Sequence, residues 1–589
     1  MRRAFRRPAI TAVTVLAVVV APAAAAPDWV ARSNENAEVL LEIMARFNPE
    51  QAGFFGVDGF DEQVFQLPLD LNAQTIAALE AALGTLRERL AAETDPAVRQ
   101  DLEILIEAAE LQIEGTRVGE RFQLPYFGLH QAIFQGIRAL LDDQIPAERR
   151  PAAIVRLNRY AGLEEGMTPI AEQAMAFIRA KFGTPDLVGP FKGQLERDLA
   201  NSGRFLDGVE QLFQQYQIAG WEPGMAALRD QLTSYERFVN EELMPRSSED
   251  FRLPAEVYAF NLRQVGVDLP VEDLVSRAKT SFREIQNEMQ ALAELVAKQR
   301  GLPSTDYRAV IRELKKEQLV GEAILPHYQQ RIEQLEKLIV DHDVVTLPER
   351  EMRIRLASEA ESAAIPAPNM RPPRLLGNTG EMGEFVLPLR IPGEAGGEEV
   401  SFDDFTFEAA SWTLSVHEGR PGHELQFAAI VEKGVSTARV LFAFNSVNVE
   451  GWALYQEAEM KPYLPLEGQL ASLQHRLLRA ARAFLDPGLQ LGQLERDEAF
   501  RVLEHEVVLS HGMALQEVQR YTFLAPAQAT AYFCGYQRLM ELRTDAERLL
   551  AAGFDRRAYH DFILAQGLLP PRLLRRAVVD EFVAARVAG

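Results

Sequence analysis

The stretch SVHEGRPGHELQ, residues 415–426, places a His-Glu pair six residues ahead of a second histidine. Its geometry decides how the surrounding chain is interpreted. On an unbroken α-helix, residues six apart are separated by about 600° of rotation and therefore point roughly 120° apart. Two imidazoles in that arrangement cannot reach one ion. A spacing of four residues would leave only about 40° between the rings and would bring both to one face.

Pro421 interrupts this stretch and changes its geometry. A proline cannot donate a backbone hydrogen bond to the carbonyl of His417, and it biases the residue before it away from helical angles. Gly419 and Gly422 add backbone freedom on either side. We therefore predict a bulge that absorbs the two extra residues and returns His423 to the face of His417.

A second His-Glu pair has the same spacing to a later histidine, in HEVVLSH at residues 505–511. This stretch contains neither proline nor glycine, so we expect a continuous helix. On such a helix His505 and His511 diverge. We assign them no metal site and interpret them as ordinary helix residues.

A third ligand candidate follows the first motif. A catalytic zinc ion needs three protein ligands and one open position. The stretch VNVEGWALYQEAEM, residues 447–460, predicts a helix with Glu450 and Glu457 nearly two turns apart on one face. We predict Glu450 as the third ligand beside His417 and His423. Glu457 is predicted to orient a ligating histidine; an exposed helix carboxylate is the alternative for it.

Helical periodicity dominates the rest of the chain, as in residues 271–301, where Gly301 ends an amphipathic pattern. Between about 343 and 403, the segments DVVTLP, MRIRLA and GEFVLPLRIP alternate like short strands between prolines and glycines. The last of them offers an edge on which an extended substrate can pair. We predict a mainly α fold, with a helical N-terminal region at 27–245 and a helical catalytic region at 246–589 that contains a strand-rich insert at about 343–403.

The first 26 residues have the pattern of an export signal. Four arginines precede an apolar run from Ala9 to about Val20, and small residues suited to cleavage follow near Ala24. The run is shorter than the roughly 20 residues that a membrane anchor needs. We expect a cleaved signal peptide and a periplasmic or secreted protein without a stable membrane anchor; an uncleaved anchor is the alternative.

The composition and the net charge exclude several classes of partner and of catalytic site. The net charge of −23 becomes −27 without the signal, which carries four arginines and no acid. Such a charge argues against nucleic acid and against anionic membrane surfaces as partners. The single cysteine, Cys534, excludes an internal disulfide, and 47% hydrophobic residues can form a large core. We find no Gly-x-Ser-x-Gly motif and no glycine loop suited to phosphate.

Longer motifs resemble a bacterial family called domain of unknown function 885. HEGRPGHELQ followed by EGWALYQE is similar to that family's HE-x-x-PGHH-LQ and EGWA-x-Y. EVQRYTFLAPAQATAYFCGYQRLMELR and FDRRAYHDFILAQGLLP resemble its later elements, and the resemblance is detailed from about 370 to 575. The chain departs from the pattern at Glu424, where the family often has a second histidine. That difference bears on the charge of the site and on specificity.

The resemblance implies a gluzincin-like zinc metallopeptidase with a deep cleft in a largely helical fold. One Zn²⁺ per chain would be held by His417, His423 and Glu450. Glu418, next to the first ligand, would serve as the general base and later as the proton donor.

Helical metallopeptidases also supply a tyrosine or histidine that stabilises the developing oxyanion. The resemblance places it near QATAYFCGY, residues 528–536. Tyr532 is our first choice, and Tyr536 and Tyr521 follow. A tyrosine that only fills the core is the alternative for each.

Two arginines are candidates for substrate binding. Arg520 and Arg543 can clamp the terminal carboxylate of a peptide through paired hydrogen bonds. Alternatively they pair with neighbours such as Glu517 and Glu541. His560 resembles a family position without an assigned role. For this histidine, a structural hydrogen bond or closure of the cleft is favoured over metal ligation.

Three functions remain open at this point. The first is an exported zinc hydrolase of peptide bonds, whether carboxypeptidase, dipeptidase or oligopeptidase, which retention of Glu418 favours. The second is a noncatalytic envelope protein that binds peptides. The third is a zinc amidohydrolase that acts on a non-peptide amide. The expected partner is a peptide or small amide, and the sequence does not choose between zinc and another divalent ion.

Overall fold

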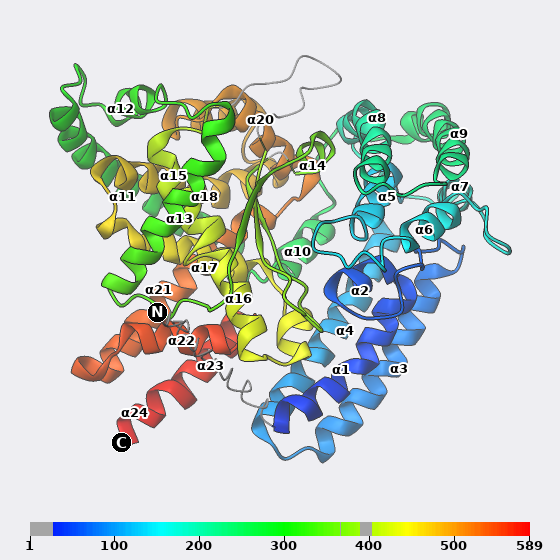
Figure 1. Cartoon of the computed structure of the whole chain (residues 1–589), viewed down its shortest axis with the longest axis horizontal. Helices are drawn as coiled ribbons and strands as arrows, with labels where there is room; N and C mark the ends of the chain where they lie inside the picture. Colours follow the sequence, from blue (N-terminus) through cyan, green and yellow to red (C-terminus); the bar gives the residue numbers. More distant parts are fainter. Residues whose placement is uncertain (1–27, 366, 389–402, 589) are drawn as a thin grey trace, which may run out of the picture.

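The computed structural model describes residues 28–365, 367–388 and 403–588. Helices make up most of these residues, and the predicted mainly α fold is confirmed. Figure 1 shows the N-terminal helices on one side of a small sheet and the C-terminal helices on the other. The predicted signal peptide lies outside the described residues. Within them, no helix combines the length and the apolar character needed to cross a membrane.

The N-terminal part is built from helices joined by short loops. The helix α4 starts at Pro96, where a proline costs no hydrogen bond, and the Asp95 side chain accepts from the amide of Ala97 at 2.9 Å. The bounds are α1 (Asp28–Phe47), α2 (Pro49–Phe55), α3 (Leu71–Ala92), α4 (Pro96–Phe122), α5 (Leu129–Arg138), α6 (Ala152–Tyr160), α7 (Ile170–Arg179), α8 (Lys192–Gln215) and α9 (Glu222–Phe238).

The chain continues through short helical turns into a second helical part. The division predicted at residue 245 stays a prediction. The bounds are α10 (Ala255–Gln264), α11 (Val271–Arg300), α12 (Tyr307–Leu314), α13 (Ile324–Asp341), α14 (Glu359–Ala364), α15 (Glu408–Leu414), α16 (His423–Lys433), α17 (Ser446–Met460), α18 (Leu466–Gln490), α19 (Arg496–Arg501), α20 (His511–Gln519), α21 (Ala531–Leu550), α22 (Arg556–Ala565), α23 (Pro571–Ala577) and α24 (Ala584–Ala588).

The core of the second part forms between α11 and α18, which pack along their length. The apolar stripe of α11 is buried there, including Leu274, Ala278 and Met289. Gly301 ends α11 with φ of 67°, a left-handed conformation that suits glycine. The helix α18 is buried almost all round, which makes it the central element beside the candidate site.

The strand-rich insert is a three-stranded sheet with the order β1-β3-β2. The strand β1 (Arg353–Leu356) runs parallel to β3 (Glu384–Leu387), and β2 (Asn369–Arg371) runs antiparallel to it. The prediction of a strand in DVVTLP was wrong, because its valines are buried in irregular backbone instead. The prediction that GEFVLPLR offers an edge was also wrong for its described part: β3 is the central strand, paired with β1 over Glu384–Leu387 and with β2 over Glu384–Val386.

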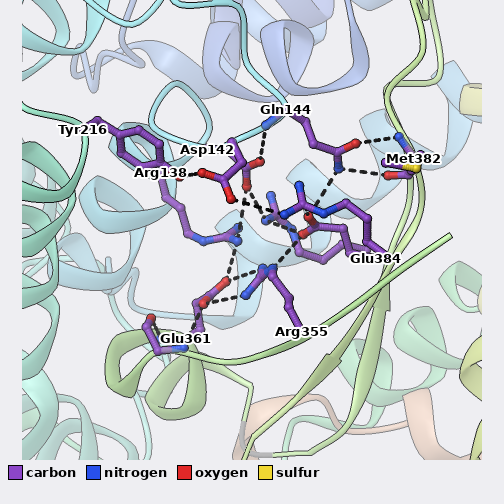
Figure 2. A network of polar contacts seen from close by, with 12 residues as sticks. Arg138, Asp142, Gln144, Tyr216, Arg355, Glu361, Met382 and Glu384 are labelled. Carbon is purple, nitrogen blue, oxygen red and sulfur yellow. Dashed lines mark hydrogen bonds and ion pairs between the residues drawn. The ribbon is translucent and has the colours of Figure 1, made fainter. Parts of the chain in front are cut away.

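A network of charged side chains joins this sheet to the N-terminal helices (Figure 2). Arg138 at the end of α5 pairs with Glu361 of α14. Glu361 also accepts from Arg355 of β1 at 2.8 and 3.0 Å. Arg355 donates in turn to the buried Glu384 of β3 at 2.9 Å. Burial opposes ionisation of Glu361, but these arginines lower its pKa to about 2.

Glu361→Gln should destabilise the fold by about 2–4 kcal/mol at pH 7, because it leaves two arginines without their shared carboxylate. Since the folded pKa lies below the ordinary value, the stabilisation is complete above about pH 5 and fades toward pH 2. Denaturant unfolding of both proteins at several pH values measures this. Glu359→Gln, an exposed neighbour on α14, is the control and should change stability by less than about 0.5 kcal/mol. A wild-type advantage that is independent of pH would contradict the account.

Candidate metal centre

The first histidine motif interrupts a helix as Pro421 predicts. The helix α15 continues into a π-helical turn at Ser415–Gly419, which carries His417 and Glu418. The chain then leaves the helix and restarts it at His423, the first residue of α16. Gly422 fills the closest point of this turn: a Cβ there would lie 2.1 Å from the carbonyl oxygen of His417. Only glycine fits this contact.

This turn brings both histidines to one place. The ring centroids of His417 and His423 lie 4.7 Å apart, and Glu450 of α17 faces both rings. Its Oε2 lies 3.6 Å from Nε2 of His417 and 3.3 Å from Nε2 of His423. Ligand atoms at about 2.0–2.1 Å from a tetrahedral zinc ion lie about 3.3 Å from one another. These three residues, here called the trio, therefore fit a zinc ion in both chemistry and spacing.

Glu457 orients one of the two rings. Its Oε1 lies 2.7 Å from Nδ1 of His417, and Thr413 donates to its other oxygen at 2.9 Å. Burial opposes ionisation of Glu457, but Arg479 and His417 lower its pKa to about 2. The Glu457 carboxylate thus holds the proton of His417 on Nδ1 and leaves Nε2 of His417 facing Glu450 and His423. The Nδ1 of His423 is buried with no such partner among the described residues.

Glu450 is held as a carboxylate between the two imidazoles. Burial opposes its ionisation, but the two histidines keep its pKa well below the usual range. Gln528 donates to its Oε1 at 3.2 Å. Its Oε2, which points between the rings, is buried and receives no hydrogen bond from the described residues. A buried carboxylate oxygen without a donor is costly unless it serves a ligand.

Glu418 differs from the other acids here, because none of the described residues donates a hydrogen bond to its carboxylate. It is only 7% exposed. Burial raises its pKa to about 7, while the nearby His423 opposes this rise. By contrast, Glu424 is fully buried and accepts from Arg420 at 2.7 Å. The departure from the family pattern at Glu424 is therefore compensated by an internal ion pair.

Tyr532 lies beside the trio, at the start of α21. Its ring stacks on that of His417 at 6.0 Å, and its hydroxyl oxygen accepts from Arg520 at 2.9 Å. Two glycines set this position, because α17 and α21 cross where Gly451 meets Gly535. A Cβ on Gly535 would lie 2.7 Å from Cα of Gly451. The backbones of α17 and α21 touch at this point, and Tyr532 is thereby brought against α17, the helix that carries Glu450.

The other predicted substrate residues are less close to the trio. Arg520 reaches it through Gln528 and Tyr532, while the buried Tyr521 donates to Glu517 at 2.6 Å. Tyr536 accepts from Arg476, and Arg543 pairs with Glu459 and Glu547. His560 bonds Val344 and Tyr455 at 2.7 and 2.8 Å, a structural role. The structure does not bring Tyr536, Arg543 or His560 into contact with the trio.

The second histidine motif forms no comparable cluster in the described part of the chain. The prediction of a continuous helix there was wrong. A π-helical turn ends at Glu506, Val508 has φ of 67°, and Ser510 caps the new helix α20 by accepting from Met513. His511 is exposed and lies 2.7 Å from Glu504. The divergence expected of His505 and His511 stays a prediction, and the chain between them is broken rather than continuously helical.

Several buried polar residues of α18 escaped the sequence-based prediction. They share one face of α18, at alternating spacings of four and three residues: His475, Arg479, Arg482 and Asp486, all buried. Arg482 forms two short hydrogen bonds to Glu517, and burial lowers the pKa of His475 to about 3. The available signal was a polar stripe along a helix whose other positions are mostly leucine and alanine.

The sequence profile of the family described as "Bacterial protein of unknown function (DUF885)" matches residues 49–578. The chain belongs to this family, which confirms the resemblance. Among curated proteins, none matches it significantly.

Two solved structures share its fold. The "putative lipoprotein from Colwellia psychrerythraea" has a TM-score of 0.71 at 17% identity, over 94% of this chain and 99% of that one. A "putative lipoprotein of unknown function from Shewanella oneidensis" has a TM-score of 0.68 at 18% identity, over 94% and 100% of the two chains. At such identities the likeness concerns the fold.

Gly535→Ala should force α17 and α21 apart, because the new Cβ would lie 2.0 Å from the carbonyl oxygen of Val447. We expect a loss of about 1–3 kcal/mol in unfolding free energy. Gly203→Ala in α8 is the control: a Cβ there meets nothing within 4 Å, and stability should rise by about 0.5–1 kcal/mol. Equal effects of the two substitutions would show that the crossing is not tightly packed.

Proposed function

We propose that this protein is an exported zinc-dependent hydrolase of peptide bonds. The observation that carries the proposal is the convergence of His417, His423 and Glu450 at zinc-ligand spacing, with Glu418 beside them. A binding protein would have no need of a buried carboxylate that none of the described residues engages. Zinc bound by the trio would polarise a substrate carbonyl and lower the pKa of a water molecule.

The chain's own residues supply the proton transfers. Glu418 accepts a proton from the attacking water and then gives it to the leaving amine nitrogen. It is buried and receives no hydrogen bond from the described residues, which leaves it free for this exchange. The Tyr532 hydroxyl donates to the oxygen on which negative charge develops. Arg520 donates to that hydroxyl oxygen and so orients its hydrogen toward the substrate.

The proposed location is the cell envelope or beyond it. The signal-like pattern of residues 1–26 supports export. The two structural relatives are described as putative lipoproteins, which agrees with an envelope setting.

Glu418→Gln should abolish most turnover, because a neutral amide cannot take the proton from water. We expect a loss of about 10²–10⁴-fold in kcat. A screen of peptides and of non-peptide amides with the wild-type protein identifies the substrate, and the variant is then assayed on it. Glu432→Gln, on the exposed side of α16, is the control. Full activity in Glu418→Gln would contradict the proposal. Cleavage of non-peptide amides alone would show that the substrate is not a peptide.

Tyr532→Phe should lower kcat by about 10²–10³-fold with little change in KM, because the hydroxyl acts on charge that develops only in the transition state. The ring keeps its stacking on His417, so folding should be retained. Steady-state kinetics on the substrate from the screen separates the two parameters. If KM rises and kcat does not change, Tyr532 binds the ground state instead.

A further inference from the structure

We propose, resting on the proposed function, that Arg479 binds the free C-terminal carboxylate of the substrate. The protein would then act on the C-terminal end of short peptides. Arg479 lies on the buried polar face of α18 and is 7% exposed. No prediction from the sequence included it.

Among buried arginines of the described residues, Arg479 is unusual in its pairing. The other six each make at least one hydrogen bond or ion pair of 2.7 Å or shorter, and they are Arg138, Arg156, Arg331, Arg420, Arg439 and Arg482. Arg479 makes none below 3.4 Å. The Nε of Arg479 is buried and has no hydrogen-bond acceptor among the described residues. A buried guanidinium so poorly paired is costly, unless a ligand completes it.

The nearest acid does not satisfy Arg479. Nη2 lies 3.5 Å from Oε1 of Glu457, but that same oxygen is already only 2.7 Å from His417. One turn earlier on α18, the Nδ1 of His475 is also buried and unpartnered among the described residues. Arg482, one turn later, donates through Nε and Nη2 to both carboxylate oxygens of Glu517. Arg479 therefore carries an unused donor beside the trio, and the preceding turn of α18 carries an imidazole nitrogen without a partner among the described residues.

Position and charge favour an anionic group here. The Arg479 guanidinium lies 5.7 Å from the centre of the Tyr532 ring, and that ring stacks on the ring of His417 at 6.0 Å. Three arginines and four carboxylates surround Tyr532 and the trio. With a divalent cation bound, the positive charges among these groups would exceed the negative charges by one. The groups counted are Arg479, Arg482, Arg520, Glu418, Glu450, Glu457 and Glu517.

Arg479 suits this role better than the two arginines predicted from the sequence. Arg543 is engaged by Glu459 and Glu547. Arg520 is engaged by Tyr532 and Gln528. A guanidinium binds a carboxylate through two parallel hydrogen bonds, and Arg479 differs from the other two arginines in making no contact shorter than 3.4 Å among the described residues.

Binding without turnover tests the inference. Zinc-loaded Glu418→Gln protein is dialysed against randomised acetylated tripeptides, supplied once with a free C-terminal carboxylate and once as the C-terminal amide. Mass spectrometry measures what is retained. We expect the acids to be retained about tenfold or more over the amides. Adding Arg479→Met or Arg479→Lys should bring this ratio close to one, because lysine cannot form the paired bonds. Arg501→Met, an exposed arginine of α19, is the control.

Zinc content is measured on every variant. Loss of zinc with equal weakening of acids and amides would overturn the inference, since Arg479 would then only support Glu457. An unchanged acid preference in the Arg479 variants would overturn it as well. If the wild-type protein cleaves no peptide while the Arg479-dependent preference persists, the hydrolase proposal fails and the binding site stands. If wild-type protein cleaves acids and amides equally, this inference alone fails.

Discussion

The turn between Gly419 and His423 is the constraint on which the candidate site depends. Without it, two histidines six residues apart would point away from each other. Gly422 makes the turn possible, because its missing side chain lets the chain pass within contact distance of the His417 carbonyl. Trp452 of α17 donates its indole hydrogen to the carbonyl of Pro421 at 3.0 Å. The turn is thereby joined to the same helix that supplies Glu450.

The rest of the site consists of buried charge that must be compensated. Two of the acids near the trio are held by cationic or imidazole partners: Glu457 lies 2.7 Å from His417 and 3.5 Å from Arg479, and Glu517 accepts from Arg482. Removing one member of such a pair costs more than the pair contributes, because the other charge stays buried. The helix α18 carries the cations of this arrangement and also packs along α11. The core and the candidate site therefore share one element.

Much of the fold and the trio could be predicted from the sequence, because the signals were local. The break at Pro421 predicted the bulge, and the spacing of Glu450 and Glu457 predicted their common face. Other features depend on contacts distant in sequence. Val508 adopts a left-handed conformation that its residue type disfavours, and the polar stripe of α18 acquires meaning only when α17 and α21 pack beside it. Arg479 could not be distinguished from an ordinary helix charge by sequence alone.

Metal content tests the central claim most directly. The purified protein and its His423→Ala variant are loaded with zinc, dialysed and analysed for bound metal. The geometry of the trio predicts about one zinc per chain in the wild-type protein and its loss in the variant. Retention of zinc by the variant, or its absence from both proteins after reconstitution, would contradict a metal site at the trio.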